Sequence, residues 1–204
     1  KEVAETEEGF TVSTLKKLAL LYDVTFLGSI PIKRSNQYFN TTIVVDKNGL
    51  QHTYDKMHLY TPAGEHEKYS AGQESKIYTI GNGIKIKPLI CYDLRFPYLS
   101  FNNGEVKYDI LLYSANWPAP RINQWKSLLV ARAIENQCYV IGVNRVGKDA
   151  NEWEYPGQSL VVNYKGEILV ELDDREQVKN LDLGMDEMVE YRDKYPFLID
   201  AKNS

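Results

Sequence analysis

A chain of 204 residues has the length of one domain, or of two small ones, and can bury a sizeable core. Its composition, 43% hydrophobic and 25% charged with 13 Gly and 8 Pro, excludes the collagen-like, low-complexity and disordered classes. The formal net charge is -4, which is too small to indicate nucleic acid or an anionic membrane as a partner.

No part of the sequence resembles a membrane span or a secretory leader. No apolar run approaches the roughly 18 residues of a spanning helix, and residues 1–5 lack the apolar centre of a signal peptide. Two cysteines, Cys91 and Cys138, are too few for a disulfide framework and suit a reducing compartment. We therefore expect a soluble cytoplasmic protein.

The N-terminal half predicts a helix, a strand and two hairpins. Apolar residues at helical spacing from Leu15 to Tyr22, behind Ser13 and Thr14, predict a helix that ends at Asp23. The β-branched and aromatic stretch 24–30 predicts a strand that Pro31 stops. Turn residues at 46–49 and 81–83 predict hairpins that pair residues 38–45 with 50–54, and 76–80 with 84–91.

The C-terminal half alternates strands and helices. It predicts buried strands at 110–113 and 139–143 on either side of a helix Ile122–Asn136, then a third hairpin of residues 160–162 and 167–172, and a last amphipathic helix Met185–Lys194. We find no repeat, linker or boundary. The pattern predicts one α/β domain over residues 1–204, with helices on the outer faces of its sheets.

Cys91 closes the strand predicted at 84–91 and precedes Tyr92-Asp93-Leu94-Arg95-Phe96-Pro97. A cysteine at such a turn holds its sulfur rigidly and can use the next backbone N–H as an oxyanion donor. Cys91 is therefore a candidate nucleophile, and a buried core thiol is the alternative. Cys138 leads into an apolar strand with no turn, so we expect it in the core.

A nucleophilic cysteine needs a cation or a base beside it, because an ordinary thiol is only a few per cent thiolate at neutral pH. Lys56, just past a strand end, is one candidate. Glu65, Glu67 and Glu74 lie downstream, where a carboxylate can orient the ammonium and relay a proton. Taken singly, each of these residues is better explained as a solvated surface charge.

The histidines offer a rival chemistry. His52, His58 and His66 lie close in sequence, and three imidazoles can hold a metal with an open fourth position, but their spacing fits no metal motif. A papain-like Cys-His pair also fits poorly, because Cys91 follows a strand and does not begin a long helix. No metal site is predicted.

Taken together, these segments resemble the nitrilase superfamily, the carbon-nitrogen hydrolases. The resemblance covers nearly the whole chain, and the spacings of 9 residues from Lys56 to Glu65 and 26 from Glu65 to Cys91 both fit. The motifs that carry it are Tyr38-Phe39-Asn40-Thr41, Tyr54-Asp55-Lys56-Met57-His58-Leu59, Glu65-His66 with Tyr69 and Gly72, and Leu89-Ile90-Cys91-Tyr92-Asp93-Leu94-Arg95-Phe96-Pro97.

The resemblance implies a catalytic set. Cys91 would attack an amide carbon, Lys56 and the Tyr92 N–H would stabilise the tetrahedral oxyanion, and Glu65 would hold Lys56 or the substrate. Water would then hydrolyse the thioester. Because both steps occur at one acyl carbon, no metal or organic cofactor is implied.

Within the superfamily, Ser114-Ala115-Asn116-Trp117-Pro118-Ala119-Pro120-Arg121 and Ala131-Arg132-Ala133-Ile134-Glu135-Asn136-Gln137 resemble the bacterial ω-amidase branch. These enzymes release ammonia from ω-amides of 2-oxo acids such as 2-oxoglutaramate. The distal carboxylate of such a substrate needs a cation, and the planar fork of Arg121 suits it. Asn116, and Trp117 as a wall, complete the expected substrate site. Arg95 and Arg132 are expected in structural ion pairs.

The implied fold is a four-layer αββα sandwich that lacks its N-terminal βα unit. In the family the first catalytic Glu lies on an early strand, ahead of the helix that here holds Leu15. Glu2, Glu5, Glu7 and Glu8 precede that helix without a strand, so none is assigned as the general base. We expect little or no turnover from the chain as written, and further N-terminal residues in the natural protein.

The expected partners are a small amide substrate and further copies of the chain in a homodimer or larger homo-oligomer, with no nucleic acid and no membrane. The alternative is an inactive family member or fragment that binds a small amide or serves as a subunit. The intact Lys56, Glu65 and Cys91 argue against that alternative, and the unassigned base argues for it.

Overall fold

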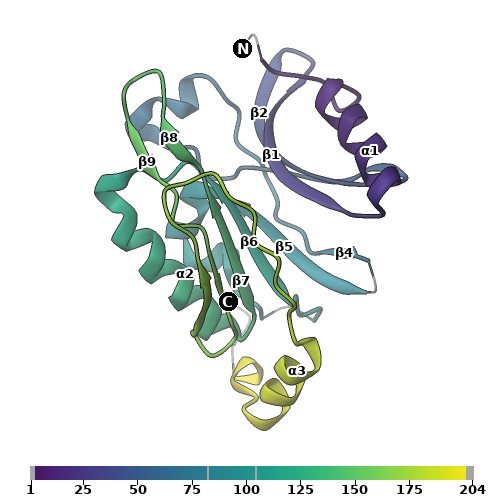
Figure 1. Cartoon of the computed structure of the whole chain (residues 1–204), viewed down its shortest axis with the longest axis vertical. Coiled ribbons are helices and arrows are strands. Elements are labelled where there is room, and N and C mark those ends of the chain that lie inside the picture. The colour runs from purple at the N-terminus through teal and green to yellow at the C-terminus, as the bar shows by residue number, and fades with distance from the viewer. Residues whose placement is uncertain (1–2, 82, 104, 201–204) are drawn as a thin grey trace.

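The computed structural model describes residues 3–81, 83–103 and 105–200. Two sheets are packed between two helices, α1 (Phe10–Tyr22) and α2 (Ile122–Asn136), which lie on opposite sides of the molecule (Figure 1). This is the four-layer αββα sandwich implied by the sequence, which is confirmed. No helix in the described part of the chain is long and apolar enough to cross a membrane.

The smaller sheet has three antiparallel strands in the order β1-β2-β3, which are β1 (Phe26–Arg34), β2 (Gln37–Asp46) and β3 (Gly49–Asp55). Side chains of β2 alternate between two cores, as the period of two requires. Ile43 and Val45 pack with Val12 of α1, whereas Val44 packs with Ile86 of the larger sheet. The predicted β2–β3 hairpin is confirmed.

Pro31 does not end the first strand, so that prediction is wrong. β1 continues to Arg34, and Pro31 pairs with Asn40. The Pro31 carbonyl accepts a hydrogen bond from the Glu5 N–H at 3.1 Å, so this residue's backbone groups point away from β2. An outward-facing position on an edge strand tolerates proline, because no ladder bond needs its missing N–H.

Helix α1 begins at Phe10, ahead of the predicted start near Ser13 and Thr14. The Glu5 carboxylate accepts hydrogen bonds from the backbone N–H of Thr11 at 2.7 Å and from its hydroxyl at 2.6 Å. It thereby satisfies an N–H that has no partner within the helix. The capping acid lies six residues before Thr11, upstream of the usual N-cap position, so the capping motifs do not predict it.

The larger sheet has six strands in the order β11-β10-β7-β6-β5-β4, which are β4 (Tyr78–Ile80), β5 (Ile84–Ile90), β6 (Ile110–Ala115), β7 (Tyr139–Asn144), β10 (Leu160–Val162) and β11 (Ile168–Glu171). Its centre, β5-β6-β7, is parallel, and α2 makes the β6–β7 crossover. The predicted β4–β5 and β10–β11 hairpins are confirmed, although Asn82 of the first turn lies outside the described residues.

In sheets of this kind, ligands bind where the parallel strands end. Cys91, Asn116 and Arg145 each follow the end of such a strand.

Helix α2 packs closely on the larger sheet. Trp125 and Leu129 are fully buried there with Leu111 and Val140. A Cβ at Gly142 would lie 2.5 Å from the Leu129 side chain and 2.7 Å from that of Trp125, so glycine is needed for the helix to approach. This close packing fixes the loop that joins β6 to α2.

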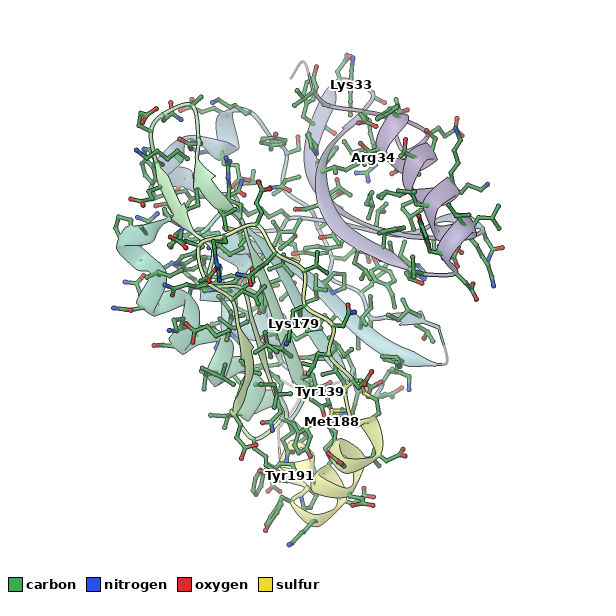
Figure 2. All side chains as sticks on the ribbon, in the orientation of Figure 1. Lys33, Arg34, Tyr139, Lys179, Met188 and Tyr191 are labelled. Carbon is green, nitrogen blue, oxygen red and sulfur yellow. The ribbon has the colours of Figure 1, made fainter. Side chains whose placement is uncertain are left out.

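At the foot of the molecule, α3 (Met185–Lys194) packs against the larger sheet and the turn after β10. Met188 is fully buried beside Tyr139, and Tyr191 packs in the same cluster, as Figure 2 shows near the foot of the molecule. The predicted helix is therefore confirmed over Met185–Lys194.

A hairpin of β8 (Val146–Lys148) and β9 (Glu154–Pro156), which is not among the predicted elements, projects from the end of β7 (Figure 1). Its strands have three residues each, too short to show a period, and residues 149–153 between them contain no glycine to mark a tight turn, unlike the turn after β10. Short 3-10 helices complete the chain: η1 (Thr61–Ala63), η2 (Glu65–Glu67), η3 (Cys91–Arg95), η4 (Pro97–Ser100), η5 (Ala119–Arg121) and η6 (Phe197–Ile199).

Candidate active site

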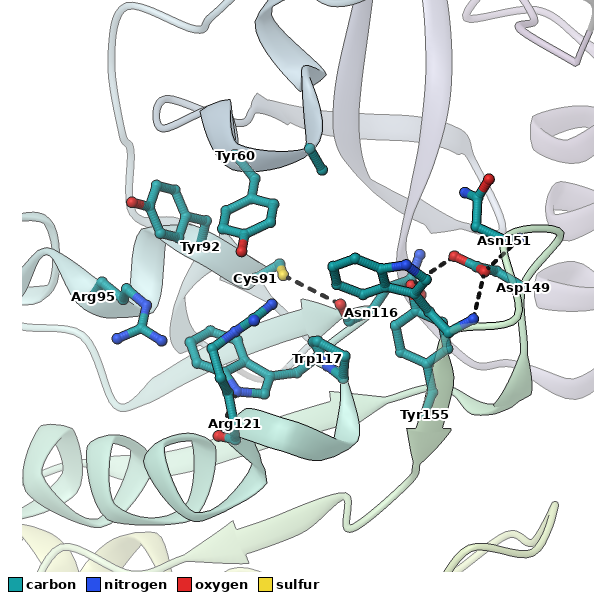
Figure 3. A pocket seen from close by; sticks show the side chains of 13 residues that line it. Tyr60, Cys91, Tyr92, Arg95, Asn116, Trp117, Arg121, Asp149, Asn151 and Tyr155 are labelled. Atoms are coloured by element: carbon teal, nitrogen blue, oxygen red, sulfur yellow. Dashed lines mark hydrogen bonds between the residues drawn. The ribbon is translucent and has the colours of Figure 1, made fainter.

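Cys91 lies at a sharp turn between β5 and η3. Its φ is 46°, in the left-handed region that non-glycine residues rarely adopt and that costs roughly 1–3 kcal/mol. The thiol is half-buried, and Sγ lies 3.8 Å from the carbonyl oxygen of Asn116, toward which it donates. Figure 3 shows the sulfur between Tyr60 and Asn116, facing a cavity. The predicted turn at the strand end is thus present and strained.

The Asp93 carboxylate holds this turn in place. It is fully buried and accepts hydrogen bonds from the Tyr54 hydroxyl at 2.7 Å, the Ile90 N–H at 3.0 Å and the His58 N–H at 2.9 Å. The ring Nδ1 of His58 lies 3.2 Å away. Burial, and then the charge of Asp93, raise the pKa of Tyr54, which therefore stays a neutral donor. The network ties the chain that carries Lys56 to the turn that carries Cys91.

Asp93→Asn is expected to lower the free energy of unfolding by about 2–3 kcal/mol. The asparagine has an NH₂ group in place of one carboxylate oxygen, so the donors that this oxygen accepted are left buried without an acceptor. Urea denaturation measures this change. Asp23→Asn is the matched control, since Asp23 forms an exposed ion pair with Lys47 at 2.8 Å, and its effect should stay within about 0.5 kcal/mol. Equal losses in the two variants would contradict the role of Asp93.

Lys56 and Glu65 form a buried ion pair beside Cys91. The Lys56 side chain is 3% exposed, and its Nζ lies 2.5 Å from Glu65 Oε2. The Glu65 carboxylate also accepts hydrogen bonds from the Tyr60 N–H at 2.6 Å and from the Asn40 amide at 3.2 Å. These extra donors compensate for the desolvation that a buried pair suffers. The predicted Lys56, Glu65 and Cys91 are therefore brought together.

The Cys91 thiol is a weak acid in this setting. Burial raises its pKa above the ordinary value near 9, Lys56 lowers it, and Glu65 and Asp93 raise it. The net direction is upward, so Lys56 opposes the effect of burial without overcoming it. The sulfur is protonated at neutral pH, and attack on a carbonyl carbon requires removal of that proton.

Two cavities meet at Cys91. One, of about 680 Å³, lies between the sheets and is lined by Lys56 and Glu65. The other, of about 280 Å³, is drawn in Figure 3 and is lined by Asn116, Trp117 and Arg121. Cys91 lines both, so its sulfur faces the ion pair on one side and a second, aromatic chamber on the other.

The predicted substrate residues Asn116, Trp117 and Arg121 all line that second chamber. Trp117 is 3% exposed and forms a wall, with its indole N–H donated to the Arg121 carbonyl at 2.8 Å. The Arg121 side chain extends from the start of α2 toward Tyr60 and the Cys91 sulfur (Figure 3). Its position fits a group that contacts the far end of a substrate.

Of the two arginines expected in structural ion pairs, only one is so placed. Arg132 pairs with Glu135 at 3.0 Å and donates to the Leu94 carbonyl at 2.8 Å. Arg95 instead lies over the Trp117 ring, 5.0 Å from its centroid, and donates to the Gln124 side chain. The prediction for Arg95 is wrong, because its guanidinium contacts an indole and a side-chain amide.

Several residues in and around the chamber were not predicted from the sequence. Asn144, at the end of β7, lines the neighbouring cavity between the sheets. It accepts from the Trp117 N–H at 2.7 Å and donates to the Trp117 carbonyl at 3.0 Å, so it fixes the loop after β6. A polar residue closing a parallel strand was a signal available in the sequence. The residues that line the chamber itself and were missed are Tyr60, Ala63, Asp149, Asn151, Trp153 and Tyr155.

The three histidines do not form a metal site. His52 stacks on Tyr78 with ring centroids 4.3 Å apart, and His58 stacks on Phe96 at 3.7 Å. In residues 3–81, 83–103 and 105–200, no group of three or more His, Cys, Asp or Glu side chains is arranged to hold a metal ion.

The sequence profile of the family described as Carbon-nitrogen hydrolase matches residues 1–193. The chain belongs to the carbon-nitrogen hydrolases. This confirms the resemblance to the nitrilase superfamily and makes the chain a carbon-nitrogen amidohydrolase.

Relatives of this carbon-nitrogen hydrolase include bacterial amidases. Omega-amidase YafV of Escherichia coli (strain K12) is 45% identical over 175 residues, which are 85% of this chain and 67% of the relative. The 2-oxoglutaramate amidase of Bacillus subtilis (strain 168) is 35% identical over 203 residues, 98% of this chain and 78% of the relative. The resemblance to the ω-amidase branch is thereby confirmed.

A solved structure agrees with the fold. XC1258 from Xanthomonas campestris is described as a CN-hydrolase superfamily protein with an arsenic adduct in the active site. It matches with a TM-score of 0.94 and 36% identity, over 100% of this chain and 78% of that one.

Proposed function

We propose that this amidohydrolase cleaves ω-amides of 2-oxo acids, such as 2-oxoglutaramate, through a thioester on Cys91. The Cys91 sulfur bonds to the amide carbon as its proton leaves, the C–N bond breaks, and the nitrogen departs as ammonia after gaining a proton. Water then adds to the thioester, which releases the carboxylic acid and restores the thiol. The observation that carries this proposal is the position of Cys91 between a buried ammonium and an arginine-lined chamber.

The proposed transition state places negative charge on the former carbonyl oxygen. Lys56 supplies a buried cation close enough to Cys91 to lower its pKa, and the Tyr92 N–H follows the nucleophile at the start of η3. Each such donor typically contributes about 3 kcal/mol. Glu65 holds Lys56 in place and, like Asp93, already accepts several hydrogen bonds, so the general base is assigned to neither.

The test combines two readouts on the chain incubated with 2-oxoglutaramate. Because the general base is unassigned and little or no turnover is expected from the chain as written, the reaction is followed over a long incubation as a single turnover. Intact-mass spectrometry after acid quenching should then show a 2-oxoglutaryl adduct on Cys91, with an equal amount of ammonia released. Free ammonia with no adduct in any condition would contradict the thioester. If neither product appeared with any small amide, the chain would act as a binding or subunit module of the family.

Arg121 is proposed to bind the distal carboxylate, and the names of the relatives, omega-amidase and 2-oxoglutaramate amidase, support such a substrate. Arg121→Ala is expected to slow reaction with 2-oxoglutaramate by about 10- to 100-fold, the size of a charged hydrogen-bonded contact. The rate with an uncharged amide of similar length should barely change. An equal loss on both amides would rule out carboxylate recognition. Arg175→Ala, at an exposed ion pair with Asp173, is the matched control.

We also propose a cytoplasmic, homo-oligomeric protein. The support for the compartment is that Cys91 and Cys138 are both free thiols. Light scattering of the purified protein tests the oligomer, and a monomer at micromolar concentration would contradict it.

A further inference from the structure

The Arg121 guanidinium lies between elements that meet only at the chamber. Its central carbon is 5.4 Å from the ring centroid of Tyr60, which precedes η1, and 5.9 Å from that of Trp153, in the β8–β9 turn. No acid in the described part of the chain forms an ion pair with it. The cation is therefore held by aromatic rings, and none of its N–H groups donates a hydrogen bond to another residue within 3–81, 83–103 or 105–200.

The turn that carries Trp153 is built around one carboxylate. Asp149 accepts hydrogen bonds from the Asn151 N–H at 2.8 Å, the Trp153 N–H at 3.0 Å and the Tyr155 hydroxyl at 2.9 Å, several of which are dashed in Figure 3. These bonds lower the pKa of Asp149 although burial acts to raise it. The hairpin thus presents the Trp153 indole in a fixed place, although that side chain is 44% exposed.

The charges of the chamber favour an anion. Its lining includes the guanidinium groups of Arg95 and Arg121, and Asp149 is its one acidic residue among those the structure describes. Both oxygens of Asp149 are engaged by the hairpin. No free carboxylate is left there to attract a cationic end group.

We propose that Trp153 and Tyr60 form an aromatic clamp that fixes the Arg121 guanidinium for the distal carboxylate of the substrate, so that Trp153 determines specificity by positioning Arg121. This inference rests on the proposed function, in which Arg121 receives that carboxylate. Aromatic faces attract a weakly hydrated guanidinium. The N–H donors in its plane then remain free to meet a carboxylate with two parallel hydrogen bonds.

The test uses protection of Cys91 from iodoacetamide, which needs no turnover. Succinamate ends in a carboxylate where butyramide, the neutral control, ends in a methyl group. The concentration of each that halves the labelling rate is measured for the full chain and for Trp153→Leu and Trp153→Phe. Leucine keeps an apolar side chain without a π face, whereas phenylalanine keeps the aromatic face.

We expect Trp153→Leu to raise the half-protection concentration of succinamate about 3- to 10-fold, in keeping with the strength of cation–π contacts, and to leave that of butyramide within about twofold. Trp153→Phe should stay within about twofold for both, which also shows that the hairpin folds. Phe101→Leu changes an exposed aromatic residue outside the chamber and should have no effect.

Three results would overturn the clamp. Equal shifts for both ligands in Trp153→Leu would make the indole an apolar wall only. No shift in Trp153→Leu, with a selective loss in Arg121→Ala, would remove the clamp and leave the proposed function standing. If the unaltered chain bound succinamate no better than butyramide, carboxylate recognition itself would fail, and the clamp with it.

Discussion

Replacing Cys91 with serine is expected to abolish acyl-adduct formation, lowering its rate by more than about 10³-fold. Burial keeps the Cys91 proton in place, and a hydroxyl in the same position is a far weaker acid than a thiol. The melting temperature should change by less than about 2 °C, because the half-buried side chain lines two cavities and packs only against the border of the core. Intact-mass spectrometry and a thermal melt measure the two effects.

Cys138→Ser is the matched control, with the opposite result expected. Cys138 is fully buried, and burial raises its pKa to about 12. A serine there should cost about 1–3 kcal/mol of stability, since a hydroxyl is buried in an apolar core, while adduct formation on Cys91 continues. If Cys91→Ser caused the larger loss of stability, Cys91 would be a core thiol and the proposed nucleophile would be wrong.

The pH dependence of alkylation separates the two thiols further. Only the thiolate reacts, and the pKa of Cys91 lies above its ordinary value near 9. The rate at which iodoacetamide labels Cys91 should therefore still increase with pH at pH 9, whereas Cys138 stays unlabelled in the folded chain. A plateau below pH 8 would show that Lys56 outweighs burial.

The sequence predicted well where a local pattern determines structure. The β2–β3 and β10–β11 hairpins and α2 follow from turn residues and apolar periodicity. The Lys56, Glu65 and Cys91 set was found by motif order, and the structure brings the three together. The predictions failed where the outcome depends on tertiary context. Pro31, for example, was expected to end β1, but it lies on the outward-facing edge of the sheet, where the strand can continue through it.

The chamber shows the same limit. Trp117 and Arg121 lie in a recognisable loop after β6, so sequence reasoning found them. Trp153 and Asp149 were missed because their hairpin consists of two three-residue strands, whose shape depends on hydrogen bonds to one carboxylate. An isolated Asp or Trp in a polar stretch carries no periodic signal, and only the fold brings the Trp153 indole to Arg121.

Lys56→Met is expected to slow acylation of Cys91 by about 10²- to 10³-fold, the usual cost of losing one oxyanion donor. The affinity for substrate should change much less, because the ammonium is proposed to meet charge that develops only in the transition state. Single-turnover rates measured at several substrate concentrations separate the two quantities. A change in affinity alone would make Lys56 a ground-state binder.

The same substitution also disturbs the fold, which has to be separated from its chemical effect. Lys56 is 3% exposed and Glu65 15%, so removing the lysine leaves a buried carboxylate without its cation and should cost about 3 kcal/mol. The double variant Lys56→Met, Glu65→Gln removes that charge, while the amide oxygen of the new side chain can still accept from the Tyr60 N–H. We expect it to regain part of the lost stability in urea denaturation and to stay as slow in acylation as the single variant. If the double variant recovered the rate together with the stability, Lys56 would only hold Glu65 in place, and the oxyanion role would pass to backbone N–H groups such as that of Tyr92.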